Sequence, residues 1–173
     1  MRDQHMSPSE LIEQWRFRNH RVQLAHYESA RRFERLHLWL GLPAVALSTL
    51  VGTTVFATLS KAPDISVQIL VGLLSVAAAV LIGLQTFLKY SELAEKHRMA
   101  GAKFPNLKHR MELLATLPPE TEVELREALA SIEDTWSKLR EESPTLPTRV
   151  WRHIEKSVLI EEYQYHVPRR KDA

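Results

Sequence analysis

Two long stretches of the chain lack charged side chains, and each is long enough to form a membrane-spanning helix. Residues 38–59 contain neither charge nor histidine over 22 residues, and residues 65–88 contain no charge over 24 residues. About 20 helical residues, rising about 1.5 Å each, cross the roughly 30 Å hydrocarbon core of a bilayer. Two helices that are apolar on every face are hard to bury in a soluble chain of 173 residues. We therefore expect two transmembrane helices, at residues 36–60 and 65–88, rather than a buried soluble hairpin.

The segment before the first span has the pattern of an amphipathic helix. "SPSE" at residues 7–10 is a capping box, with Ser7 and Glu10 three residues apart and Pro8 at the first helical position. This predicts a cytoplasmic helix within residues 1–35. It either lies on the membrane surface or packs on other helices, and its balanced charges favour packing. Its apolar stripe is predicted to comprise Leu11, Trp15, Val22, Ala25, Ser29, Phe33 and Leu36.

The segment after the second span carries a coiled-coil-like seam that is predicted to continue directly out of the membrane helix. Its positions alternate steps of three and four: Tyr90, Leu93, His97, Ala100, Phe104, Leu107, Met111 and Leu114. Pro105 predicts a kink or a short break near Phe104.

Two further helices are expected in the cytoplasmic region at residues 89–173. After the proline turn in "LPPE" (117–120), a second seam predicts an antiparallel helical hairpin with the first. Its members are Leu125, Leu129, Ile132, Trp136 and Leu139. A last helix is predicted from Val150, Trp151, Ile154, Val158 and Tyr165. The expected fold class is thus all-α: a two-span hairpin, an N-terminal helix and an antiparallel cytoplasmic bundle.

The distribution of basic residues predicts the orientation of the spans. Eleven Lys and Arg residues lie in the segments just before the first span and just after the second, whereas Lys61 alone lies in the connection. Basic residues stay on the cytoplasmic side. We therefore expect a multi-pass protein of the bacterial inner membrane, with both termini in the cytoplasm and a short external turn at residues 61–64.

The candidate chemistry outside the spans is weak. The chain has no cysteine, which excludes disulfides, thiolate catalysis and Cys-ligated zinc. Glu34 and His37 have Glu-x-x-His spacing, and Glu92, Glu95 and His97 follow the second span, but a di-iron site needs two such motifs. The arginines of the N-terminal segment are nearly balanced by acids, which argues against a nucleic-acid polymer as partner. We expect no enzyme activity, no catalytic residue, no cofactor and no metal site.

The spans themselves carry a stripe of small and polar residues. Small residues let helices approach closely in lipid, and Ser, Thr and Gln can hydrogen-bond across the contact. The stripe either packs the hairpin within one chain or forms the wall of an oligomeric pore, and the second reading is favoured. The candidate pore or helix-packing residues are Gly52, Thr53, Gln68, Gly72, Ser75, Ala79, Gly83 and Thr86. Pro43 and Pro105 are candidate hinges, although Pro43 is equally compatible with a simple interfacial bend.

Several short motifs resemble the SLATT family, the SMODS- and SLOG-associating two-transmembrane effector domains. They are "GLP" entering the first span, "GTTVF" near its outer end, "GLQTFL" leaving the second span, "AEKHR" beyond it and "ESPTLPTRVW" at 142–151. Trp15 with His20 or His26 also fits the family pattern, so the resemblance covers nearly the whole chain.

The resemblance implies a membrane effector of a bacterial anti-phage conflict system. Such an effector is expected to form homo-oligomers in membrane lipid and to open a pore that kills or arrests the infected cell, as in abortive infection. The expected partner is a cytoplasmic sensor, a nucleotidyltransferase, or its cyclic or oligonucleotide product. The alternative from another class is a non-conducting membrane scaffold that recruits a cytoplasmic partner through its helical bundle.

Overall fold

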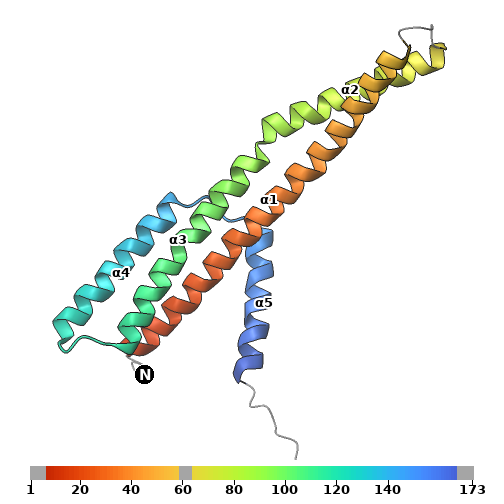
Figure 1. The fold of residues 1–173 in the computed structure, drawn as a ribbon. Helices are drawn as coiled ribbons and strands as arrows, with labels where there is room; N and C mark the ends of the chain where they lie inside the picture. The colour runs from red at the N-terminus through yellow and green to blue at the C-terminus, as the bar shows by residue number, and fades with distance from the viewer. Residues whose placement is uncertain (1–6, 59–63, 167–173) are drawn as a thin grey trace, which may run out of the picture. The chain divides into compact units, whose positions relative to one another are not determined.

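The computed structural model describes the backbone of residues 7–58 and 64–166, and the side chains of residues 7–57 and 64–158. These residues form α-helices and no strand, which confirms the all-α prediction (Figure 1). The helices are α1 (Pro8–Thr58), α2 (Ile65–Leu88), α3 (Tyr90–Thr116), α4 (Glu122–Glu142) and α5 (Thr148–His166). The predicted turn at 61–64 lies outside the described residues except for Asp64, the N-cap residue of α2.

The chain forms two compact units. Residues 1–30 and 95–173 make up one unit, here called the bundle, and residues 31–94 make up the other, here called the hairpin. The bundle is therefore discontinuous in sequence, because the hairpin is inserted between its two parts. Helix α1 contributes its first part to the bundle and its second part to the hairpin.

The capping box at the start of α1 forms as predicted. The backbone N–H of Ser7 donates to Glu10 Oε2 at 2.8 Å, and the backbone N–H of Glu10 donates to Ser7 Oγ at 3.3 Å. These two bonds satisfy backbone donors that have no partner within the first helical turn. The bond from the Ser7 backbone, together with its hydroxyl, lowers the pKa of Glu10.

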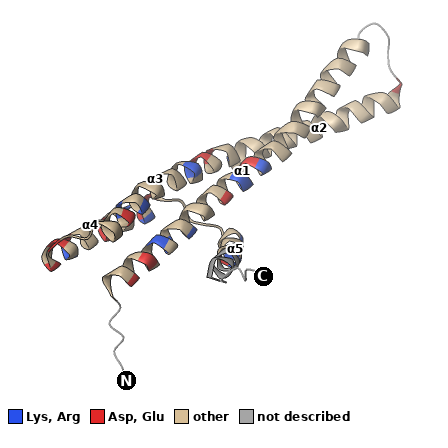
Figure 2. Cartoon of the chain, turned by 60° about the horizontal axis from the view of Figure 1, so that its bottom comes forward, with Lys and Arg blue, Asp and Glu red and all other residues tan. Residues whose placement is uncertain are grey.

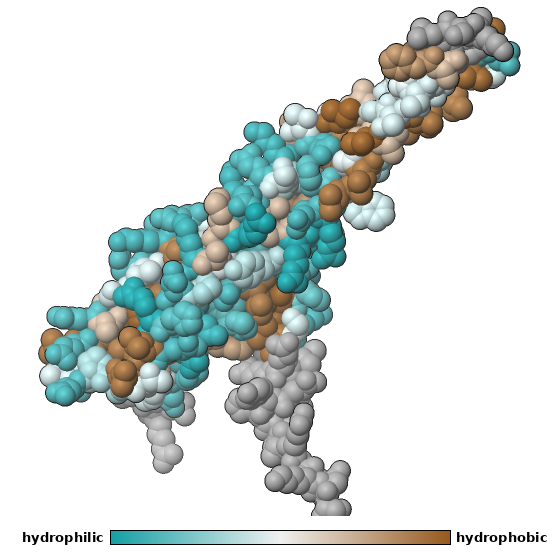
Figure 3. Space-filling model, in the orientation of Figure 1, coloured by the Kyte–Doolittle hydropathy of each residue, from teal (hydrophilic) through white to brown (hydrophobic). Residues whose placement is uncertain are grey.

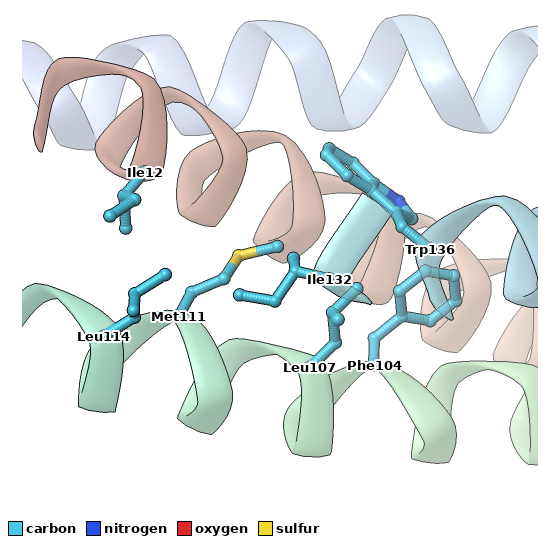
Figure 4. Close-up of a cluster of buried hydrophobic side chains, with 7 residues drawn as sticks. All are labelled: Ile12, Phe104, Leu107, Met111, Leu114, Ile132 and Trp136. Atoms are coloured by element: carbon cyan, nitrogen blue, oxygen red, sulfur yellow. The ribbon is translucent and has the colours of Figure 1, made fainter. Parts of the chain in front are cut away.

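The main core of the bundle lies between α1, α3 and α4. Figure 4 shows Leu107 and Phe104 of α3 with Ile132 and Trp136 of α4, and Ile12 of α1 at one end of the cluster. The predicted seams of α3 and α4 are confirmed, because all their bundle members are buried or pack against this cluster. Apolar burial at heptad spacing thus holds the three helices together.

The buried stripe of α1 shares four members with the prediction, Trp15, Val22, Ala25 and Ser29, and differs from it at Leu11, which is half-buried. Ile12, Asn19, His26 and Ser29 are buried, with Trp15 and Val22 packed against the core, so the true spacing alternates 3 and 4 without interruption. The sequence-based stripe missed Ile12, Asn19 and His26 because two of them are polar. The preference for packing over a surface position is confirmed for the bundle part of α1, where Ala25 is fully buried.

Polar contacts fix the register of the bundle helices. Lys103 Nζ donates to Glu142 Oε2 at 2.7 Å, and Arg110 Nη2 donates to Ser131 Oγ at 2.9 Å. Higher numbers on α3 thus meet lower numbers on α4, which is the predicted antiparallel arrangement. On the other side, a second apolar cluster joins Ala25 of α1 to α5, whose members are Val150, Ile154 and Val158. The side chain of Tyr165, also predicted for this helix face, lies outside the described residues.

The helices break at a different place from the one expected. Helix α3 is unbroken at Pro105, and α1 is unbroken at Pro43. Of the two outcomes predicted near Phe104, the break is therefore wrong, and the kink stays a prediction. Instead, α2 and α3 are separated at Lys89, which has a left-handed backbone (φ 46°, ψ 40°). The prediction that the seam helix continues without interruption out of α2 is therefore wrong at this residue. No proline or glycine marks the position, which is why the sequence pattern gave no signal there.

Candidate functional site

The hairpin exposes its apolar side chains instead of burying them. Only 6% of the most apolar stretch of each long helix is buried within the chain, and both helices are long and apolar enough to cross a membrane. Helix α2 carries no charge, whereas Lys, Arg, Asp and Glu are spread along α3, α4 and the first part of α1 (Figure 2). On the face drawn in Figure 3, apolar side chains gather over the hairpin and hydrophilic ones over the bundle. Soluble proteins rarely expose continuous apolar surface of this kind.

The two helices of the hairpin pack through a face that the sequence stripe did not identify. Ala78 is buried, and the half-buried residues of α2 recur around it at helical spacing: Val71, Leu74, Ser75, Leu81, Gln85 and Leu88. On α1, Ala44 is buried and Gly41, Leu47 and Val51 are half-buried. Large aliphatic side chains thus supply most of the contact, and Ser75 is the single predicted site residue of α2 within it.

The other predicted site residues of α2 lie beside this contact rather than within it. They are all exposed: Gln68, Gly72, Ala79, Gly83 and Thr86. A Cβ atom built on Gly72 or Gly83 meets nothing within 4 Å. The same holds for Gly52 of α1, which is half-buried, and its neighbour Thr53 is exposed. Packing within one chain therefore does not require these small residues.

A polar contact that sequence reasoning missed lies in the hairpin. The side-chain amide of Gln85 approaches Nδ1 of His37 at 3.4 Å. A Cβ on Gly41 would stand 3.0 Å from Gln85 Nε2, so the absence of a side chain at Gly41 makes room for this amide. Two features of the sequence could have indicated this contact. Gln85 is the only glutamine in the second half of α2, and Gly41 is the only glycine at the start of the first apolar stretch.

Most hydroxyl groups of the hairpin are satisfied within their own helix. Thr53 Oγ1 donates to the Thr49 carbonyl at 3.0 Å, Ser75 Oγ to Val71 at 2.8 Å and Thr86 Oγ1 to Ile82 at 3.0 Å. These bonds let polar residues lie on an apolar surface at low cost. Gln68, Gly72 and Ser75 also line a cavity of about 310 Å³, together with Thr54 of α1.

The bundle contains a buried pair of histidines from α1 and α3. Nδ1 of His26 lies 3.0 Å from Nδ1 of His97, and each residue is 2% exposed. Burial and then the neighbouring His97 lower the pKa of His26 to about 4, and burial also lowers the pKa of His97. Both rings are therefore neutral near pH 7, and one N–H donates to the other nitrogen. The ring of Phe104 stacks on His26 with centroids 5.6 Å apart.

The histidines and acids considered for a metal are not gathered into one cluster among the described side chains. Among the described side chains, no group of three or more His, Asp or Glu residues could hold an ion. His97 contacts His26, and His37 contacts Gln85.

The fold and the hairpin define an all-helical protein with two helices long and apolar enough to span a membrane. Comparison with family models, with curated proteins and with solved structures finds no match to this chain.

Proposed function

We propose that this chain is a two-span membrane effector that assembles into a homo-oligomeric pore. The observation that carries the proposal is the outward stripe of small and polar residues on α2. A Cβ atom added to Gly72 or Gly83 would meet nothing within 4 Å, and Ala79, between them on the stripe, is exposed. In lipid, such a stripe is typical of a contact with another helix.

An assembly is required because one hairpin cannot enclose a channel. Side-by-side copies can place the glycine edge of each α2 stripe against its neighbour. The polar edge, with Gln68 and Thr86, and the threonines of α1 then turn toward water. The resemblance to SLATT effectors supports a role in bacterial anti-phage defence at the inner membrane, with a signal arriving from the cytoplasm. On this proposal both termini and the bundle lie in the cytoplasm, and the protein acts without catalysis.

The proposal is tested by measuring conductance and assembly together. Expression in cells loaded with a potential-sensitive dye is expected to depolarise the membrane once the protein is activated. Gly83→Leu fills the stripe and is expected to abolish depolarisation and to shift cross-linked oligomers to monomers. Ala77→Leu is the matched control, because Ala77 is exposed on the opposite side of α2 from the stripe.

Two outcomes would contradict the proposal. Equal depolarisation by Gly83→Leu and by the wild type would remove the stripe from the mechanism. Absence of both depolarisation and leakage from reconstituted vesicles, with oligomers intact, would instead indicate a non-conducting scaffold that recruits a partner through the bundle.

A further inference from the structure

A cavity of about 540 Å³ opens in the bundle between α1, α4 and α5. Arginine and aromatic side chains dominate its wall: Phe17, Arg18, Arg21, Trp136, Arg140 and Trp151. We call it the arginine–tryptophan pocket. Its volume lies within the range of about 300–1,000 Å³ that is typical of sites for small ligands.

The charge of the pocket is unbalanced. Arg21 Nη2 donates to Glu155 Oε1 at 3.0 Å, and Glu155 is the single carboxylate in the wall. Arg18 and Arg140 form no ion pair among the described side chains. By contrast, Arg126, on the same helix as Arg140, pairs with Glu122. Two uncompensated guanidinium groups therefore face one small cavity, an arrangement suited to an anion.

The aromatic part of the wall suits a planar group. The guanidinium of Arg18 lies 5.3 Å from the ring centroid of Trp136, and that of Arg21 lies 5.1 Å from Trp151. Indole faces and guanidinium planes are the surfaces on which nucleobases and other planar rings stack.

Two buried donors at the pocket have no partner. Trp136 is 7% exposed, and its Nε1–H donates no hydrogen bond among the described residues. The Nε–H of Arg21, a side chain that is 15% exposed, is likewise without an acceptor. Buried donors are nearly always paired in folded proteins, so these two groups leave unmet hydrogen-bonding capacity in residues of the pocket wall.

From these observations we propose that the arginine–tryptophan pocket binds a small organic anion that carries a planar ring, of the nucleoside-phosphate type. Arg18 and Arg140 hold the anionic group, and the indoles of Trp136 and Trp151 contact the ring. The inference rests on the proposed function only where it identifies the chemical class of the cytoplasmic signal. Ligand binding is measured separately from conduction.

The test uses the full-length protein in a nonionic detergent, with binding followed by calorimetry and by tryptophan fluorescence. The nucleoside monophosphates AMP, GMP and UMP are titrated separately, with adenosine as the ring-only probe and inorganic phosphate as the anion-only probe. At least one monophosphate is expected to bind at least tenfold more tightly than either partial probe. Binding of phosphate alone with equal affinity, or of no monophosphate at 1 mM, would overturn the proposal.

Variants locate the binding in the pocket. Arg140→Gln is expected to weaken binding at least tenfold, whereas Arg126→Gln, an exposed arginine on the same helix, leaves it unchanged. Arg18→Gln provides an independent loss on α1, and circular dichroism confirms that each variant is folded. Equal affinity in wild type, Arg18→Gln and Arg140→Gln would place the ligand elsewhere and overturn the assignment. Binding without vesicle leakage supports this site and counts against the pore, and leakage without binding does the reverse.

Discussion

Nδ1 of His26 on α1 lies 3.0 Å from Nδ1 of His97 on α3, and the pair is closed off from solvent in the bundle. The 3.0 Å contact requires at least one of the two Nδ1 atoms to be unprotonated, because two protonated nitrogens would both be donors and would repel each other. The contact therefore connects the stability of the bundle to the protonation of two residues that lie 71 positions apart in the chain.

The first prediction is that the bundle loses stability in mild acid. The pKa of His26 falls from 6.5 to about 4 on folding, so between these values the unfolded chain binds more protons than the folded chain. The free energy of unfolding is thus highest above about pH 6.5 and falls as the pH drops toward 4, by up to about 1.4 kcal/mol per pH unit for each histidine. Thermal unfolding in detergent at pH 5.0 and 7.5 measures the change.

The double variant His26→Gln with His97→Gln is expected to remove most of this pH dependence, since glutamine does not titrate. His153→Gln, at an exposed position on α5, serves as the control and leaves the dependence unchanged. A wild-type protein equally stable at both pH values would contradict the assignment.

The second prediction concerns Asn19, which is fully buried beside α3. Its Nδ2 donates to the Phe104 carbonyl at 3.1 Å, while its Oδ1 has no partner among the described residues. Asn19→Asp places a charge in this site and is expected to cost about 3 kcal/mol or more. Asn19→Leu removes the unsatisfied oxygen together with the bond, and is expected to change stability by less than about 1 kcal/mol. Equal losses in the two variants, measured by thermal unfolding, would refute this explanation.

The third prediction tests the close packing at Gly101 of α3. A Cβ at this position would lie 3.2 Å from Cε1 of Tyr27 and 3.4 Å from Cβ of His26. Gly101→Val is therefore expected to destabilise the bundle by about 1–3 kcal/mol through overpacking. Ala102→Val, at the next and exposed position, bears only the helix-propensity cost of about 0.5 kcal/mol. Similar unfolding midpoints for the two variants would contradict the prediction, because they would show that Tyr27 and His26 of α1 move aside at little cost.

The fourth prediction uses the left-handed backbone at Lys89. Glycine adopts φ 46° without the clash that a Cβ causes, so Lys89→Gly is expected to raise stability by up to about 1 kcal/mol. A glycine introduced within a helix is expected to have the opposite effect on stability. Met99→Gly in α3 is therefore expected to lower stability by about 1 kcal/mol. A loss in both variants would mean that α2 and α3 form one helix in solution.

The fifth prediction concerns topology and follows from the absence of native cysteine. In spheroplasts, a membrane-impermeant maleimide is expected to label Asp64→Cys at the start of α2. It is expected to label Glu122→Cys at the start of α4 only after the cells are lysed. Both positions are exposed, so differences in labelling report the side of the membrane rather than burial. The reverse pattern would invert the proposed orientation.

The sequence predicted the helices well where most members of a repeat of three and four residues are apolar. The seams of α3 and α4 and the capping box at Ser7 were all found from spacing alone. On α1 the predicted stripe included Trp15, Val22, Ala25 and Ser29, which are buried or packed on the core. It missed Asn19 and His26, because these polar residues occupy core positions that only their partners on α3 make favourable. A polar residue at a seam gives no local signal for the group that will satisfy it.

The candidate site shows the same limit. The stripe through Gly72 and Gly83 was visible in the sequence. The sequence did not show which face of α2 packs against α1, and in the structure the large aliphatic residues supply that face. The arginine–tryptophan pocket was not visible at all. Its members come from α1, α4 and α5, and no short motif connects them.

The insertion of the hairpin between the two parts of the bundle imposes an order on biosynthesis. When Ile12, Asn19 and His26 leave the ribosome, the side chains that will bury them lie in a segment that begins at residue 95 and has not been made. Both apolar stretches emerge in the interval and can enter the lipid before α3 is complete. The core residues in the amino-terminal part of α1 therefore lack their packing partners until translation is well past the second apolar helix. The bundle folds last.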